Sequence, residues 1–271
     1  MKKILFNFFI LNVLLVLLLC SCNDDNGKQT QGKIIKNAVK DADGNKYDAV
    51  KIGDQVWMAE NLRTTKYDNG TSIPLGNSSS KGRGYRYYPD GKASNVNKFG
   101  YLYDWYAVMN NNNVQGGSDA NPSGVQGICP KGWHVPSQNE WKEMVDYVAY
   151  QIESGELEAG QLRNPTVAKA LASTEGWRTS DRSGTPGYIP LANNFTGFSA
   201  VPAGVYYFGS PQEGACGCWG ESGCFWTTSY NPPAPYYYAI EFNFSDVKCH
   251  WAGSGVQREK DHAFSVRCVK D

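Results

Sequence analysis

Residues that could do chemistry are densest in the stretch CPKGWHVPSQNEW, from Cys129 to Trp141. A thiol, the imidazole of His134 and the carboxylate of Glu140 are groups that bind metals or transfer protons. The same stretch contains S-x-x-E, the helix capping box, in which Ser137 and Glu140 satisfy free N–H groups at a helix start. Apolar residues at helical spacing follow at Trp141, Met144, Val145 and Val148. We therefore interpret Glu140 as a cap, His134 as a packed ring and the stretch as scaffolding.

The acidic segment DADGN also resembles a metal site. Asp41, Asp43 and Asn45 have the spacing of calcium ligands, but an EF-hand loop needs Gly at position 6 and Glu at position 12. The chain has Lys46 and Ile52 there. We predict a tight turn between two strands, and the sequence leaves open whether a calcium site exists elsewhere.

Cysteines and histidines near the C-terminal end offer two further alternatives. The C-x-C-x₅-C pattern of Cys216, Cys218 and Cys224 suggests zinc, but the paired C-x₂-C knuckles of zinc sites are absent. Metal or Cys–His chemistry is the second alternative, from the residues Cys249, His250, His262 and Cys268. The sequence contains no G-x-S-x-G, P-loop or H-E-x-x-H motif. We expect no catalytic residues, no metal and no cofactor.

The N-terminus predicts export and lipid attachment. Lys2 and Lys3 precede a mainly apolar run of 16 residues, shorter than the roughly 20 that span a bilayer. The sequence LCSC then resembles a bacterial lipobox, with Cys22 as the lipidated residue. We predict a signal peptide over 1–21 and a polar, flexible tether over 22–35. A transmembrane anchor and ordinary secretion with cleavage near Ser21 are the weaker alternatives.

Composition and charge limit the classes of function and fold that the protein can have. The chain of 271 residues has no net charge, which argues against nucleic acid as a partner because binding phosphates needs a basic surface. It contains 29 Gly, 17 Tyr, 11 Phe and 8 Trp, a composition that favours short strands, turns and long loops. Six cysteines remain beyond Cys22, and an even number in an exported chain favours disulfide bonds.

The pattern along the chain predicts where these elements lie. Three short strands are expected over 34–62, loops over 66–97 and an exposed loop over 110–127. The main helix follows Ser137, and a weaker one spans 166–173. The remainder is strand and loop, ending in a strand over AFSVRCVKD with Phe264, Val266 and Cys268 on its buried face. We expect Cys129 to pair with Cys268, whereas the pairing of Cys216, Cys218, Cys224 and Cys249 stays open.

Taken together, several motifs resemble the Fibrobacter succinogenes major paralogous domain family (FISUMP). They are DADGNKYDAVKIGDQVWMAENLRTTKYDNG, YLYDWYAV, CPKGWHVPSQNEW, FSAVPAG, FWTTSY and FSVRCVKD, in this order. The resemblance implies one α+β domain over 36–271 with a C-type-lectin-like fold, related to the sulfatase-modifying-factor fold. Such a domain has small antiparallel sheets, one main helix, one or two short helices and long loops. Family members are typically exported proteins, often lipoproteins.

The sequence supports neither calcium-dependent sugar binding nor formylglycine generation, the activities of the two related fold families. The E-P-N, Q-P-D and W-N-D triplets of calcium-dependent lectins are absent, and the surroundings of Cys216, Cys218 and Cys224 do not match formylglycine-generating enzymes. We expect a non-catalytic binding or adhesion module for a glycan or a protein. The aromatic-rich segment 206–251 supplies candidate ligand contacts at Trp219, Tyr236, Tyr237 and Trp251, whereas Trp226 and Tyr238 are expected in the core.

The expected protein is therefore an outer-membrane lipoprotein of the kind found in Bacteroidetes. It contacts the membrane through its N-terminal lipid, and the acidic pair Asp24 and Asp25 suggests display on the outer face. The alternative function is a structural component of a surface assembly, and an enzyme related to formylglycine-generating proteins is a weaker one. Ligand identity, membrane face and oligomeric state stay open.

The lipid attachment can be tested by removing the acceptor thiol. Because the acyl chains supply the attachment, Cys22→Ser should leave soluble or unprocessed chain in place of a membrane-associated mature form. Membrane fractionation with mass spectrometry of the N-terminus checks this. An unmodified N-terminus on the wild-type protein contradicts the prediction.

Overall fold

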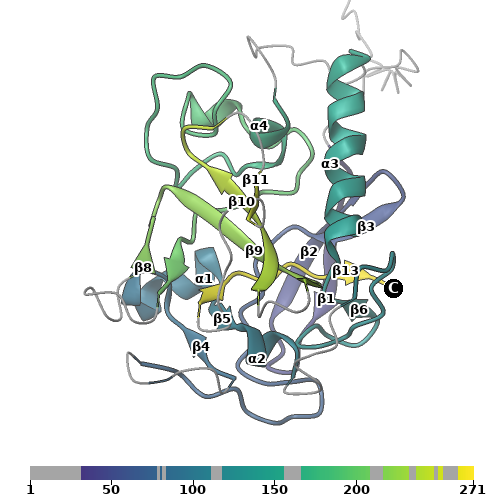
Figure 1. Ribbon diagram of the computed structural model, residues 1–271, viewed down its shortest axis with the longest axis vertical. Coiled ribbons are helices and arrows are strands. Elements are labelled where there is room, and N and C mark those ends of the chain that lie inside the picture. Colours follow the sequence, from purple (N-terminus) through teal and green to yellow (C-terminus); the bar gives the residue numbers. More distant parts are fainter. Residues whose placement is uncertain are drawn as a thin grey trace, which may run out of the picture.

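The computed structural model describes residues 32–77, 80, 84–110, 118–155, 166–207, 216–231, 236–246, 250–252 and 262–271. These residues form three antiparallel sheets and one long helix, α3 (Gln138–Glu153), which stands along one side of the molecule (Figure 1). The other helices are α1 (Val96–Phe99), α2 (Trp105–Val108), α4 (Val167–Leu171) and the 3₁₀ turns η1 (Pro89–Gly91), η2 (Ala93–Asn95) and η3 (Pro190–Ala192). The α+β class is confirmed. No helix among the described residues has the length and apolar character to cross a bilayer.

The three sheets are small and draw on distant parts of the chain. The first has the order β1-β2-β3-β13-β6, with β1 (Ile34–Lys40), β2 (Lys46–Ile52), β3 (Gln55–Met58), β6 (Trp133–His134) and β13 (Val269–Lys270). The second has the order β11-β10-β9, with β9 (Ser222–Asn231), β10 (Tyr236–Asn243) and β11 (His250–Ala252). The third has the order β4-β5-β12-β7-β8, with β4 (Arg86–Tyr87), β5 (Leu102–Asp104), β7 (Val205–Tyr206), β8 (Cys216–Gly217) and β12 (Ala263–Phe264).

The three N-terminal strands and their turns lie where the sequence predicts them. In the first turn the Asp41 carboxylate accepts the backbone N–H groups of Asp43 and Asn45, at 3.0 and 2.9 Å. It also accepts the Asn45 amide at 2.8 Å and the Tyr47 hydroxyl at 2.5 Å. Both carboxylate oxygens are thus occupied by protein donors, as in an Asx turn. The turn interpretation of DADGN is confirmed.

The main helix begins with the predicted capping box. The Ser137 hydroxyl accepts the Glu140 N–H at 3.2 Å, and the Glu140 carboxylate accepts the Ser137 N–H at 2.8 Å. Its apolar stripe is buried, and the Trp141 ring lies 4.6 Å from that of Trp57 in β3. The helix therefore covers the first sheet through aromatic contacts. The second predicted helix is α4.

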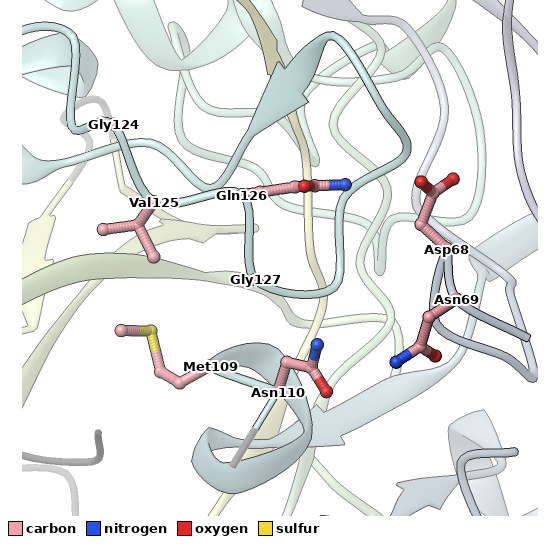
Figure 2. A pocket seen from close by; sticks show the side chains of 8 residues that line it. All are labelled: Asp68, Asn69, Met109, Asn110, Gly124, Val125, Gln126 and Gly127. Carbon is pink, nitrogen blue, oxygen red and sulfur yellow. The ribbon is translucent and has the colours of Figure 1, made fainter. Parts of the chain in front are cut away.

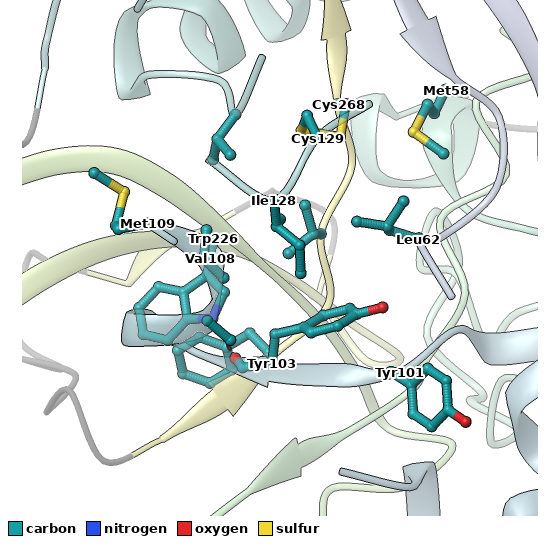
Figure 3. Close-up of a cluster of buried hydrophobic side chains, with 14 of the residues drawn as sticks. Met58, Leu62, Tyr101, Tyr103, Val108, Met109, Ile128, Cys129, Trp226 and Cys268 are labelled. Carbon is teal, nitrogen blue, oxygen red and sulfur yellow. Dashed lines mark hydrogen bonds between the residues drawn. A yellow bond between two sulfur atoms is a disulfide. The ribbon is translucent and has the colours of Figure 1, made fainter. Parts of the chain in front are cut away.

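The predicted disulfide bond is present. Cys129 and Cys268 are joined, 139 residues apart in sequence, within a buried cluster that also contains Trp226 (Figure 3). Trp226 is fully buried, as predicted, and its indole N–H donates to the Tyr103 carbonyl at 2.7 Å. Closing a loop of this length stabilises the folded state by about 4 to 5 kcal/mol in the chain-entropy estimate. The bond ties the start of the main helix to the C-terminal segment.

The prediction of one closing strand is wrong, and the predicted exposed loop contains one buried residue. The C-terminal segment is not one strand, because β12 pairs in the third sheet and β13 in the first. Between them every residue from Ser265 to Cys268 is buried, so burial does not alternate. In the predicted exposed loop over 110–127, Ser123 is buried and its hydroxyl donates to the Val135 carbonyl at 2.6 Å.

Arg267 is fully buried at the switch between the two sheets. Its guanidinium donates to the carbonyls of Met58, Phe198 and Ser199 at 3.0, 2.5 and 2.7 Å. It also donates to the Asn61 amide oxygen at 2.6 Å, and it lies 4.6 Å from the centre of the Phe198 ring. Burial lowers the pKa of Arg267 to about 9, which leaves the group protonated at neutral pH. The Arg267 guanidinium therefore donates hydrogen bonds to backbone carbonyl groups from separate segments of the chain.

Replacing this cation should be costly. Arg267→Met keeps much of the volume but leaves several buried acceptors unpaired, and we expect a loss of about 3 to 5 kcal/mol in the free energy of unfolding. Urea unfolding monitored by tryptophan fluorescence measures it. The matched control is Arg182→Met at an exposed arginine, which should change stability by no more than about 0.5 kcal/mol. Equal effects of the two substitutions would contradict the role given to Arg267.

Candidate functional site

A polar cavity of the described residues lies beside the end of α2. Its volume is about 440 Å³. Three segments line it, and Figure 2 shows their side chains arranged around a common space. The lining residues are Asp68, Asn69, Met109, Asn110, Gly124, Val125, Gln126 and Gly127. We call this cavity the amide pocket, because three carboxamides and one carboxylate supply its polar side chains.

The polar side chains of the amide pocket retain unused hydrogen-bonding groups. Within the described part of the chain, the side chains of Asp68 and Asn110 make no hydrogen bond. The Asn69 amide oxygen accepts the Thr71 N–H at 2.9 Å, and Figure 2 shows its NH₂ group on the side that faces Asn110. The Gln126 NH₂ group donates to the Cys129 carbonyl at 3.2 Å, and its oxygen is unengaged among the described residues. The pocket thus offers both donors and acceptors to a ligand.

Tight backbone geometry fixes the wall formed by residues 124–127. Gly127 has φ +54°, and a Cβ atom there would lie 2.3 Å from the Val108 carbonyl oxygen. That carbonyl accepts the Ile128 N–H at 2.8 Å. Only glycine permits both the left-handed conformation and this close approach. Opposite, Asn110 also has positive φ, 55°, a conformation that asparagine adopts more readily than most residues.

The stretch CPKGWHVPSQNEW supports this wall. The Glu140 carboxylate accepts the Ser123 N–H at 3.1 Å in addition to that of Ser137, and the Val135 N–H donates to the Val125 carbonyl at 2.9 Å. The scaffolding interpretation of Glu140 is therefore confirmed. The stretch does not carry the site, but it positions the segment that forms one side of the pocket.

His134 is held between two carboxylates within that scaffold. Its Nε2 lies 2.6 Å from Glu140 and its Nδ1 lies 2.8 Å from Asp271. Ionised carboxylates only accept, so both ring nitrogens must donate and the ring carries a positive charge. Burial acts to lower the pKa of His134, but the hydrogen bonds and charges of Glu140 and Asp271 outweigh it, and the pKa is raised.

Of the predicted ligand contacts, only Trp219 has a described side chain, and it does not line the amide pocket. Trp219 is half-buried, and its ring lies 4.4 Å from that of Phe99. The side chains of Tyr236, Tyr237, Tyr238 and Trp251 lie outside the described residues, as do Cys249 and the side chain of Cys216. A ligand surface formed by these aromatics therefore stays a prediction.

The metal alternatives have no support in the part of the chain that the structure describes. No group of three or more His, Cys, Asp or Glu side chains is placed there to hold a metal ion. Cys224 is buried, whereas Cys218 is half-buried and forms no disulfide bond.

Sequence reasoning missed the amide pocket. Its residues come from segments that the pattern could describe only as loops, and none forms a known motif. The asparagine run that begins at Asn110 and the Asn69-Gly70 turn were the available signals, and both also fit solvent-exposed turns.

The residues that match a known family model include the amide pocket and the residues that position it. The model of the Fibrobacter succinogenes major domain matches residues 50–270. The chain belongs to this family. The Fibrobacter succinogenes major domain of this chain thus contains all eight pocket residues and the Cys129–Cys268 bond. No curated protein and no solved structure matches the chain.

The charged His134 predicts a specific pH dependence of stability. A histidine whose pKa is raised on folding stabilises fully below its unfolded pKa of about 6.5, and the stabilisation is lost as pH rises through the folded pKa. The difference in free energy of unfolding between wild type and His134→Gln should therefore be largest near pH 6 and shrink toward pH 9. Urea unfolding across this range measures it.

Asp271→Asn is the matched variant for this experiment. It removes one of the two carboxylates that favour the charged ring, so the loss of stabilisation should occur at lower pH than in wild type. If the difference in free energy of unfolding between wild type and His134→Gln does not change with pH, the charged state proposed for His134 is contradicted.

Proposed function

We propose that the chain is a non-catalytic binding module that holds a carbohydrate in the amide pocket. The observation that carries this proposal is the convergence of Asp68, Asn69, Asn110 and Gln126 around one cavity with unused donors and acceptors. A volume of 440 Å³ falls within the roughly 300 to 1,000 Å³ typical of small-molecule sites.

Carbohydrate is the ligand class that best fits this chemistry. Each sugar hydroxyl both donates and accepts, and carboxamides and carboxylates can meet both needs at adjacent positions. Met109 and Val125 add apolar surface that the C–H groups of a sugar ring can contact. One carboxylate among neutral amides also favours an uncharged ligand over an anionic one, because like charges repel.

The surroundings of the pocket favour binding over catalysis. His134, the histidine nearest in sequence to the pocket wall, is buried and donates both ring N–H groups to carboxylates, so no nitrogen is free to act as a base. An enzyme related to formylglycine-generating proteins is a weaker candidate, with no described residue that supports it.

The cellular setting belongs to the same proposal. The domain is the C-type-lectin-like part of an exported lipoprotein, attached to the outer membrane through Cys22. Three small antiparallel sheets beside one long helix are consistent with that fold. The alternative is a structural component of a surface assembly, in which the aromatic-rich segment 206–251 would be a protein interface.

A glycan array tests the proposal directly. The processed chain should bind a subset of neutral glycans, and Asp68→Ala combined with Gln126→Ala should weaken binding at least about tenfold, since hydrogen bonds to a charged group contribute roughly 1.5 to 3 kcal/mol. Both side chains are exposed, so the melting temperature should change little. Isothermal titration with the best glycan measures the change in affinity.

The control is Asp181→Ala, an exposed carboxylate in a separate and more open depression. It should leave glycan affinity unchanged. An array without binding, together with stable capture of one envelope protein by wild type, would instead favour the assembly component.

A further inference from the structure

Exposed apolar side chains are concentrated in two short segments of the described chain. Individually exposed apolar residues are ordinary, but several in one place mark an interaction surface. Four of the six large ones lie in β1 or at the turn η3. The six are Ile34, Ile35, Leu75, Tyr150, Ile189 and Leu191.

The start of β1 lies against the segment that follows η3. The Gly32 N–H donates to the Phe195 carbonyl at 3.2 Å, and a Cβ atom on Gly32 would lie 2.0 Å from the Thr196 carbonyl oxygen. The Ile34 side chain reaches Gly197, where an added Cβ atom would be 2.8 Å away. The chain therefore enters the domain directly beside the segment that follows η3.

The apolar tip at η3 is held in an unfavourable conformation. Ile189 has φ +47°, in the left-handed region that β-branched residues seldom adopt. Ile189 is 58% exposed, and the turn presents Leu191 with 86% of its surface in solvent. Strain and exposed apolar surface both cost stability, and their coincidence points to a functional contact.

A buried lysine fixes the ends of this tip. The Lys169 ammonium, 1% exposed, donates to the Tyr188 carbonyl at 2.5 Å and to the Asn193 amide oxygen at 2.7 Å. The Ile189 carbonyl lies 3.4 Å from the same nitrogen. Burial lowers the pKa of Lys169 to about 8, so the group is mostly protonated and able to donate at neutral pH. The tip is thus a positioned element.

The place where the chain enters the domain indicates what the tip contacts. Gly32 lies ten positions after Cys22, and a chain of ten residues can span at most about 36 Å. If Cys22 carries lipid, the bilayer lies within that distance of Gly32, which packs beside the segment that follows η3. Lys33 is exposed at the same point, and a cation there is attracted to anionic headgroups.

We propose that the Ile189–Leu191 tip, together with Ile34 and Ile35, inserts into the headgroup region of the bilayer that holds the lipid anchor. This inference rests on the proposed lipid attachment. Apolar side chains at a bilayer surface add to the affinity supplied by acyl chains. Figure 1 shows α4, to which residues 194–196 are hydrogen-bonded, and α2, beside the amide pocket, toward opposite ends of the long axis. The contact would therefore direct the pocket away from the membrane.

Site-specific shielding of the tip tests the proposal. The processed full chain carrying Leu191→Cys is added to preformed vesicles of phosphatidylethanolamine with a minority of phosphatidylglycerol. It then reacts with a membrane-impermeant maleimide, and the parent protein gives the background from native thiols. We expect modification of position 191 to be at least about tenfold slower on vesicles than in detergent-free solution without vesicles. Leu75→Cys, at another exposed apolar residue, should react equally in both.

The outcomes separate this inference from the proposal on which it rests. Co-flotation with vesicles and full reactivity at position 191 would overturn the membrane contact and leave the lipid attachment standing. Failure of the processed chain to float would overturn both. If modification of position 191 slows with rising protein concentration in the absence of vesicles, the tip contacts a second copy of the chain. That result would overturn the bilayer as its partner.

Discussion

The fold depends on the buried guanidinium of Arg267. Its four acceptors belong to the end of β3, the segment after it, and residues 198–199, and all of them are neutral oxygens. A buried cation without a carboxylate partner is stable only when its donors are fully used, and the rings of Phe198 and Phe225 add favourable contact with its faces. The C-terminal segment can switch from the third sheet to the first because this group satisfies the backbone around the switch.

The same principle accounts for the long stretch without regular structure between α4 and β7. Buried carbonyls need donors, and a segment that forms neither helix nor sheet must find them elsewhere. Lys169 supplies them to residues 185–193, and Arg267 supplies them to Phe198 and Ser199. Two interior cations therefore add donors to the backbone hydrogen bonds that this stretch makes with its neighbours, such as that from the Thr196 N–H to the Ala170 carbonyl.

Sequence patterns predicted the parts of the fold that depend on contacts between residues close together in the sequence. The turn at Asp41, the capping box of Ser137 and Glu140, and the helix α4 follow from residues adjacent in sequence. The Cys129–Cys268 bond was also predicted, although the single strand in which Cys268 was expected is absent. The closing strand was wrong for a physical reason: alternation indicates which side chains can face a core, but Arg267 is buried by contacts with residues about 70 and 200 positions away.

The amide pocket could not be predicted for a related reason. Asp68, Asn110 and Gln126 line one cavity through tertiary contacts, such as those from the Val135 N–H to the Val125 carbonyl and from the Ile128 N–H to the Val108 carbonyl. These contacts leave no pattern in the sequence. Polar loop residues are typical of solvent-exposed turns, and their grouping around one cavity is a property of the tertiary structure. The stretch from Cys129 to Trp141 therefore acts indirectly. The side chains of His134 and Glu140 bond to each other, and Glu140 also bonds to Ser123, which stabilises the wall that carries Gln126 beside the cavity.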